Sequence, residues 1–171
     1  MIQVLPSLHY MPGDRWFPDH PPQTVTAVPY VQIDPRKTVH LEGLAFDHNG
    51  DLLCCNIYES ILYRVDRETK KVSQFYEFED KSFSPTAIKV HRDGRLFVAG
   101  TDMKSKPLGV GGGIVVMNPD GTNAHKIISG WNADDLVFDK DGGFYFANYG
   151  VVGNLFEVLP VLVEEIKKAR G

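Results

Sequence analysis

The stretch "LEGLAFDHNGDLLCCN" (residues 41–56) is the first of three copies of one sixteen-residue pattern. The other copies are "PTAIKVHRDGRLFVAG" (residues 85–100) and "ADDLVFDKDGGFYFAN" (residues 133–148). Each copy consists of an apolar stretch, a turn and a second apolar stretch. The turns hold glycines that lie 44 and then 48 residues apart: Gly50, Gly94 and Gly142. Repeats of this length with several short strands are typical of propeller blades, whereas helical repeats would need long stretches with a 3.6-residue period.

The repeats and the residues that follow them predict short strands joined by polar turns. The first repeat predicts four strands, near 44–47, 51–57, 61–66 and 72–78. The second predicts four more, near 87–90, 95–100, 113–118 and 124–129. The third begins with strands at 135–138 and 143–148, and "GNLFEV" (153–158) is a candidate for its next strand. We therefore expect an all-β fold that contains two complete propeller blades and part of a third.

The expected domain organisation has three parts. Residues 1–23 are rich in proline, histidine and aromatic residues and predict an irregular arm. Residues 24–158 form the incomplete propeller, with one or two strands expected over the alternating stretch 24–33. Residues 159–171 suit a short amphipathic helix, since a proline stands near its start and Glu164 lies four residues before Lys168.

A propeller needs four to eight blades to close its ring. The ring is therefore open, or another chain completes it, or the sequence is a fragment of a longer protein. The fragment is the favoured interpretation at this stage. Open sheets would also leave unpaired edges and apolar faces through which the chain could self-associate or aggregate.

Composition excludes several classes of function. The 171-residue chain is 43% hydrophobic and carries a net charge of -4, so we expect a globular protein without a nucleic-acid surface, which would need clustered Lys and Arg. No signal peptide or membrane span is recognisable, and a cytoplasmic location without membrane contact is expected. Cys54 and Cys55 are adjacent and should point to opposite faces of a strand, so we interpret them as packing residues.

Equivalent positions of the repeats are expected to meet at one mouth of the central channel, because the innermost strand of each blade runs along that channel. The second position holds Glu42, Thr86 and Asp134, and Asp135 occupies the third position of the last repeat. Carboxylates that converge in a partly dry pocket repel one another unless a cation neutralises them. Oxygen ligands with irregular geometry favour calcium, with magnesium as the alternative.

Simpler interpretations of the polar residues remain open. Without a bound metal, Glu42 would cap a turn, and Asp134 and Asp135 would be exposed acids on a loop. The pattern favours neither this interpretation nor the metal site. Asn56 and Asn148 are interpreted as turn residues before metal ligands. The glycine-rich stretch "TDMKSKPLGVGGG" is interpreted as a surface loop, because a phosphate-binding loop would precede a helix.

The chain resembles the SMP-30/gluconolactonase/luciferin-regenerating-enzyme group and, within it, the Drp35-type lactonases. The motifs that carry this resemblance, over about residues 24–150, are "LEGLAFD", "AIKVHRDGRLFVAG", "GGIVVMNPDGTN" and "DDLVFDKDGGFYFANYG". The resemblance implies a six-bladed propeller that hydrolyses lactones with calcium at the channel mouth. It implies Glu42 and Asp134 as metal ligands, and Asp134 with its neighbour Asp135 as catalytic residues. The remaining ligands would come from later blades, which this sequence lacks.

The predicted function is therefore a calcium-dependent hydrolase of small lactones, with weak metal affinity and negligible turnover for this chain alone. The alternative is a non-catalytic propeller that serves as a platform for binding proteins or sugars. A half ring without a stable fold is a third hypothesis. The sequence does not specify the natural substrate, since the loops that would select it belong to the missing blades.

Overall fold

The computed structural model describes residues 26–35, 39–105, 111–149 and 154–158. All regular elements in these ranges are β-strands. They are β1 (Leu41–Phe46), β2 (Leu52–Asn56), β3 (Ile61–Val65), β4 (Val72–Glu77), β5 (Phe83–Val90), β6 (Leu96–Asp102), β7 (Gly113–Met117), β8 (His125–Ser129), β9 (Ala133–Phe138), β10 (Phe144–Asn148) and β11 (Asn154–Val158).

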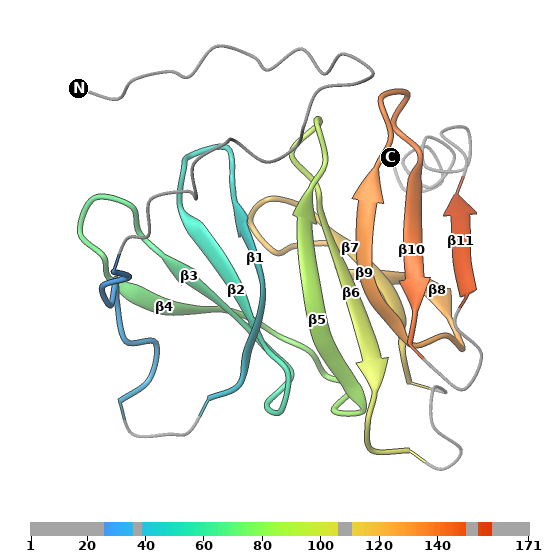
Figure 1. Ribbon diagram of the computed structural model, residues 1–171, viewed down its shortest axis with the longest axis horizontal. Coiled ribbons are helices and arrows are strands. Elements are labelled where there is room, and N and C mark those ends of the chain that lie inside the picture. The colour runs from blue at the N-terminus through green and yellow to red at the C-terminus, as the bar shows by residue number, and fades with distance from the viewer. Residues whose placement is uncertain (1–25, 36–38, 106–110, 150–153, 159–171) are drawn as a thin grey trace, which may run out of the picture. The chain divides into compact units, whose positions relative to one another are not determined.

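The strands form three antiparallel sheets in which each strand pairs with its neighbour in the sequence. The first sheet contains β1–β4, the second β5–β8 and the third β9–β11. In Figure 1 the first strands of the three sheets, β1, β5 and β9, follow one another across the middle of the picture. Consecutive antiparallel sheets with adjacent inner strands are the architecture of a partial β-propeller, as the repeats predicted.

The tight turns between paired strands follow from the residues that the repeats share. In the first repeat the Asp47 carboxylate accepts hydrogen bonds from the backbone N–H groups of Asn49 and Asp51, at 2.8 and 3.0 Å. Asp139 accepts two equivalent bonds in the third repeat. Gly50 takes a φ of +84°, a conformation that glycine adopts without steric cost. The side chains of these aspartates therefore stabilise the turns.

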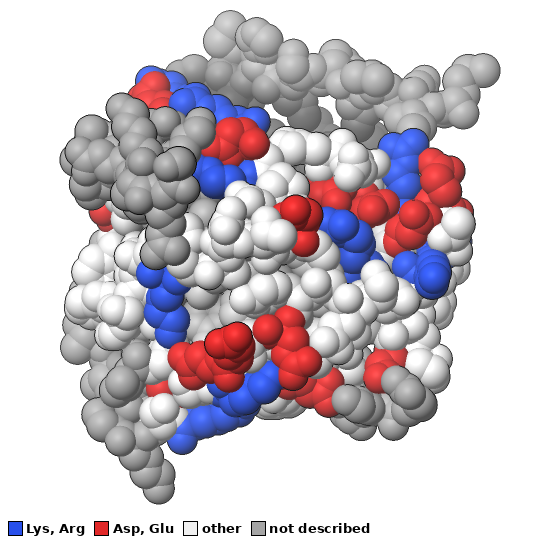
Figure 2. Space-filling view, turned by 180° about the vertical axis from the view of Figure 1, so that it is seen from behind, with Lys and Arg blue, Asp and Glu red and all other residues white. Residues whose placement is uncertain are grey.

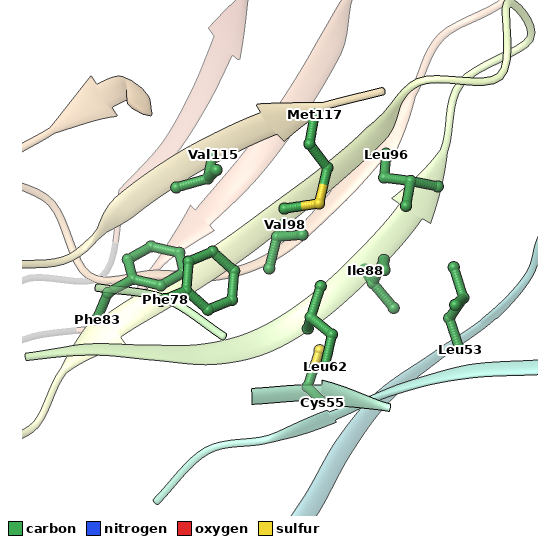
Figure 3. Packing of buried hydrophobic residues seen from close by; sticks show 10 residues of the cluster. All are labelled: Leu53, Cys55, Leu62, Phe78, Phe83, Ile88, Leu96, Val98, Val115 and Met117. Atoms are coloured by element: carbon green, nitrogen blue, oxygen red, sulfur yellow. The ribbon is translucent and has the colours of Figure 1, made fainter. Parts of the chain in front are cut away.

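Two apolar cores hold the sheets together. The first lies between the first and second sheets, where Leu53, Cys55 and Leu62 meet Ile88 and Val98 (Figure 3). The second lies between the second and third sheets and is rich in aromatic rings. It is built from Ala87, Phe97, Ala99, Ile114, Val116, Ala133, Leu136, Phe144 and Phe146. Since apolar burial is the main favourable term in folding, these sheet-to-sheet contacts fix the inner strands relative to one another.

Some boundaries differ from the predicted ones. The inner strands begin earlier: Glu42, Thr86 and Asp134 lie inside β1, β5 and β9, not before them. The ladders continue there through irregularities between Glu42 and Leu44 and between Pro85 and Ala87. The strand predicted for residues 24–33 is wrong over 26–33, which form no strand.

Other expectations can be compared only in part. The arm over residues 1–23 and the helix over 159–171 lie outside the described residues. Residues 26–30, the described part of the N-terminal unit, contain no strand. Cys54 and Cys55 are both buried free thiols, which confirms their interpretation as packing residues. Within the described residues, no helix is long and apolar enough to cross a membrane.

Candidate functional site

The first inner strand lies unusually close to the second. Gly43 has a φ of +47°, and a Cβ atom there would stand only 2.5 Å from the Cα of Ala87 in β5. Glycine is needed at such a position, because it accepts a positive φ and leaves room for the neighbouring backbone. The close approach places Glu42, the residue before Gly43, beside the middle of β5.

A side-chain hydrogen bond links the second inner strand to the third. The Thr86 hydroxyl lies 3.1 Å from the carbonyl oxygen of Ala133 in β9 and 3.3 Å from that of Ala99 in β6. Ala133 directly precedes Asp134. Thr86 therefore holds the backbone that carries Asp134, and the second positions of all three repeats lie along one row of strands.

The electrostatics of Asp134 agree with the expected convergence of the two acids. Partial burial raises the pKa of Asp134, and the negative charges of Glu42 and Asp135 raise it further. Glu42 acts on Asp134 from another sheet, 92 residues away in the sequence, so the fold brings the two carboxylates into the same field. Their roles as metal ligands stay predictions.

Glu42 has a neighbour that the sequence analysis did not single out. Nε2 of His40 lies 3.3 Å from Oε1 of Glu42, and both side chains are about half exposed. The His40 ring also meets the ring of Tyr58 edge to face, with 5.3 Å between centroids. Only its position two residues before Glu42 could have indicated His40, since residues two apart in an extended chain share a face.

Asp135 differs from Asp134 in its partners. Its carboxylate lies 3.0 Å from Nζ of Lys89 in β5 and accepts a 2.8 Å hydrogen bond from the backbone N–H of Leu136. Asp135 therefore has a cationic partner, whereas burial and the neighbouring acids raise the pKa of Asp134. The catalytic assignment of Asp135 stays a prediction.

A hydrogen-bond network supports the backbone in front of the acidic pair. The Asn148 side-chain oxygen accepts the N–H of Asn132 at 3.1 Å. The Asn132 side-chain oxygen in turn accepts the N–H of Asp102 at 2.7 Å, which joins the third sheet to the second. Trp131 packs on Phe156, with 4.5 Å between ring centroids. These contacts depend on tertiary structure, and the sequence pattern could not have revealed them.

Asp102 anchors the glycine-rich loop, whose residues 106–110 lie outside the described part. Its carboxylate accepts hydrogen bonds from the N–H groups of Lys104, Ser105 and Gly111 at 3.0, 2.8 and 2.7 Å. Burial opposes the charge, yet these bonds outweigh burial and lower the pKa of Asp102 to about 2. Asp102 is thus a structural acid that fixes the backbone on both sides of residues 106–110.

The site on this chain consists of a pair of acids. Across the described ranges, no three His, Cys, Asp or Glu residues are grouped closely enough to hold a metal ion together. The Asn56 amide donates a 3.2 Å hydrogen bond to Glu59 in the following turn, in keeping with its interpretation as a turn residue.

Curated relatives match most of the chain. Lactonase drp35 of Staphylococcus saprophyticus is 38% identical over 155 residues, which cover 85% of this chain and 45% of the relative. Lactonase drp35 of Staphylococcus aureus strain bovine RF122 is 38% identical over 165 residues, covering 87% of this chain and 48% of the relative. The chain thus spans about half the length of these relatives. No protein-family model matches the chain.

Solved structures share the fold at low sequence identity. A gluconolactonase from Xanthomonas campestris superimposes with a TM-score of 0.58 and 16% identity, over 70% of this chain and 44% of its own. A structure described as a putative gluconolactonase gives a TM-score of 0.53 and 18% identity, over 70% of this chain and 49% of its own. At this identity the likeness establishes the propeller fold alone.

The curated relatives and the three antiparallel sheets both indicate a propeller protein related to lactonases. The matched region corresponds to about half of each curated relative. Over that half, the chain is a homologue of the staphylococcal lactonases named drp35.

Proposed function

We propose that this chain contributes Glu42 and Asp134 to a calcium-dependent site that hydrolyses small lactones. The observation that carries the proposal is the raised pKa of Asp134, to which Glu42 contributes from another sheet. Two carboxylates held in one field repel each other, and a divalent cation between them would relieve that repulsion. The homologous lactonases support lactones as the substrate class.

The donor chemistry of this pair suits calcium. Glu42 and Asp134 offer carboxylate oxygens, which hard cations prefer. Calcium binds six to eight oxygen atoms, more than two carboxylates supply. We therefore expect weak calcium affinity for a single chain, with further ligands coming from outside it. Magnesium is the alternative ion.

Asp134 is the proposed general base. As a ligand of the proposed ion, its carboxylate would lie within reach of a water molecule bound beside that ion. In the proposed reaction an oxygen of the Asp134 carboxylate accepts the proton of the attacking water, which contributes about 10²- to 10⁴-fold to the rate. A bound divalent ion would supply Lewis-acid polarisation of the lactone carbonyl.

The neighbouring residues have supporting roles in this proposal. The Lys89 ammonium pairs with the Asp135 carboxylate at 3.0 Å and fixes the position of this second negative charge beside Asp134. That charge further favours proton uptake by Asp134. Thr86 fixes the backbone before Asp134 through the carbonyl oxygen of Ala133.

Calcium titration of the purified chain by calorimetry tests the metal proposal. We expect weak binding that Glu42→Gln and Asp134→Asn each reduce, because each change removes one charged ligand. Glu68→Gln is the matched control, since Glu68 is an exposed acid paired with Arg67 and outside the site. Binding that is equal in all four proteins would contradict the assignment.

An assay of lactone hydrolysis tests the proposed reaction. The release of acid from a simple lactone measures the rate. We expect little turnover from an isolated chain, and any turnover should require calcium and Asp134. A melting temperature that is indifferent to both calcium and chelator would favour the non-catalytic binding platform, because a ligand that binds the folded state must stabilise it.

A further inference from the structure

The two interfaces between the sheets use the same positions of the sixteen-residue pattern. In each sheet, the residues at the fourth, twelfth and fourteenth positions of the pattern face the sheet that precedes it in the sequence. In the second sheet these are Ile88, Leu96 and Val98, which belong to the first core. In the third sheet they are Leu136, Phe144 and Phe146, which belong to the second core. All six side chains are buried.

The first sheet presents the same positions to solvent along its inner strand. Leu44 is 63% exposed, whereas its equivalents Ile88 and Leu136 are 0% and 2% exposed. Phe46, two residues further on, is 69% exposed. We call this surface of the first sheet the leading face; it carries Leu44, Phe46 and Leu52, together with Cys54, which Ile33 covers.

The third sheet has the complementary free surface. Positions thirteen and fifteen face the following sheet, as Leu53 and Cys55 do in the first core and Phe97 and Ala99 in the second. In the third sheet these positions hold Tyr145 and Ala147. Tyr145 pairs with Val137 across the ladder, and Val137 is 62% exposed. We call this surface the trailing face; it carries Val137, Tyr145 and Ala147.

We propose that a second copy of this chain covers both surfaces, with the leading face of each copy packed on the trailing face of the other. The two contacts would be identical and related by a two-fold axis along the channel. Heterologous contacts of this kind generate a ring when the rotation closes. Two copies would supply six sheets, which lies within the four to eight blades of known propellers.

The case for a second copy rests on continuity with an interface that already exists twice within the chain. Sheet one packs on sheet two, and sheet two packs on sheet three, through equivalent positions. The leading and trailing faces are the two unpaired halves of that same interface. An apolar partner surface of matching pattern is therefore present on every copy. Exposed apolar patches of this kind commonly mark protein interfaces.

Part of the leading face is already occupied within one chain. Ile33 packs beside Cys54, Ile61, Tyr63 and Val72, toward the outer strands of the first sheet. Leu44 and Phe46 on the inner strand remain open. The proposed contact therefore concentrates near the channel, where the internal interfaces bring inner strands together.

The ring would also bring a second Glu42 and a second Asp134 to the same channel. This consequence rests on the proposed function, because it supplies ligands that one chain lacks. Dimer formation itself depends on neither calcium nor lactone. A measured molecular mass therefore tests the assembly independently of the activity.

The experiment measures the mass of the full chain by light scattering and sedimentation over a range of concentrations, with chelator present. We expect a dimer that Leu44→Glu and Val137→Glu each weaken by about 100-fold or more, since each buries an unpaired carboxylate. Met103→Glu is the control, an exposed apolar position outside both faces. Circular dichroism and melting temperature verify that each variant is folded.

Mixing the two variants determines the geometry. A mixed dimer contains one Leu44→Glu copy and one Val137→Glu copy. One of its two contacts carries both substitutions, whereas the other joins an unaltered leading face to an unaltered trailing face. We therefore expect the mixture to regain dimers that neither folded variant forms alone. A monomeric parent chain, open-ended polymers, or dimers that persist in either variant would overturn the proposal.

Discussion

Gly43 of β1 lies against the backbone of Thr86 in β5, and a Cβ atom at Gly43 would stand 2.7 Å from the Thr86 carbonyl oxygen. The contact joins the first two sheets at their inner strands, next to Glu42. The fold of the chain and the position of its first candidate ligand therefore depend on the same glycine.

Replacement of Gly43 by alanine should lower the free energy of unfolding by about 2–4 kcal/mol, because it adds backbone strain at a positive φ and overpacks β5. Gly130→Ala is the control: Gly130 has a φ of +79°, but no atom lies within 4 Å of its added Cβ. That variant should lose only about 1 kcal/mol. If urea unfolding shows equal losses of stability for both variants, the close approach of Gly43 to β5 makes no separate contribution to the free energy of unfolding.

Thr86 offers a test of how Asp134 is positioned. Thr86→Val keeps the shape of the side chain and removes its hydrogen bond to the Ala133 carbonyl, which should cost about 1 kcal/mol. If the hydroxyl positions Asp134, calcium affinity and the NMR-measured pKa of Asp134 should also change. Thr86→Ser should restore both. A loss of stability with unchanged pKa and affinity would reduce Thr86 to a purely structural role.

The repeats sufficed to predict the three sheets. Turn residues such as Gly50 and Asp47, together with alternating apolar residues, locate the hairpins from local chemistry alone. The starts of the inner strands were less predictable, because the ladder passes through Gly43 and Pro85, which ordinarily mark the end of a strand. Residues 26–33 alternate like a strand without forming one, since a strand needs a hydrogen-bonded neighbour as well as a pattern.

The candidate site could be predicted only where repeat symmetry applies. Equivalent positions indicated Glu42 and Asp134, and burial together with the charge of Glu42 raises the pKa of Asp134. The ion pair between Lys89 and Asp135 joins non-equivalent positions of neighbouring repeats. His40 lies before the repeat begins. Such contacts depend on how side chains meet between sheets, which a single sequence does not record.

The raised pKa of Asp134 gives a pH-dependent prediction. The folded chain holds this proton more tightly than the unfolded chain, whose aspartate has a pKa near 3.8. The group's contribution to stability is therefore complete below pH 3.8 and is lost as the pH rises through the raised pKa. At pH 7, with chelator present, Asp134→Asn should increase stability by about 0.5 kcal/mol, a small gain because solvent screens an exposed carboxylate.

Calcium should reverse this difference. The parent chain should melt at a higher temperature when calcium is added, since the ion binds the folded state, and Asp134→Asn should respond less. Thermal melting at pH 4 and pH 7, each with chelator or calcium, measures both effects. An asparagine variant that is less stable than the parent at pH 7 in chelator would contradict the assigned repulsion.

Asp102 should show the opposite pH dependence, because its hydrogen bonds from Ser105, Gly111 and Lys104 overcome burial and lower its pKa to about 2. Its stabilising contribution is present above the unfolded pKa of 3.8 and is lost as the pH falls through about 2. Asp102→Asn keeps one acceptor oxygen but removes the charge, so it should cost about 2 kcal/mol at pH 7. Urea unfolding at pH 7 and pH 3 should show this cost shrinking at the lower pH. A cost that is the same at both values would mean that the carboxylate stabilises the loop through its shape and not through its charge.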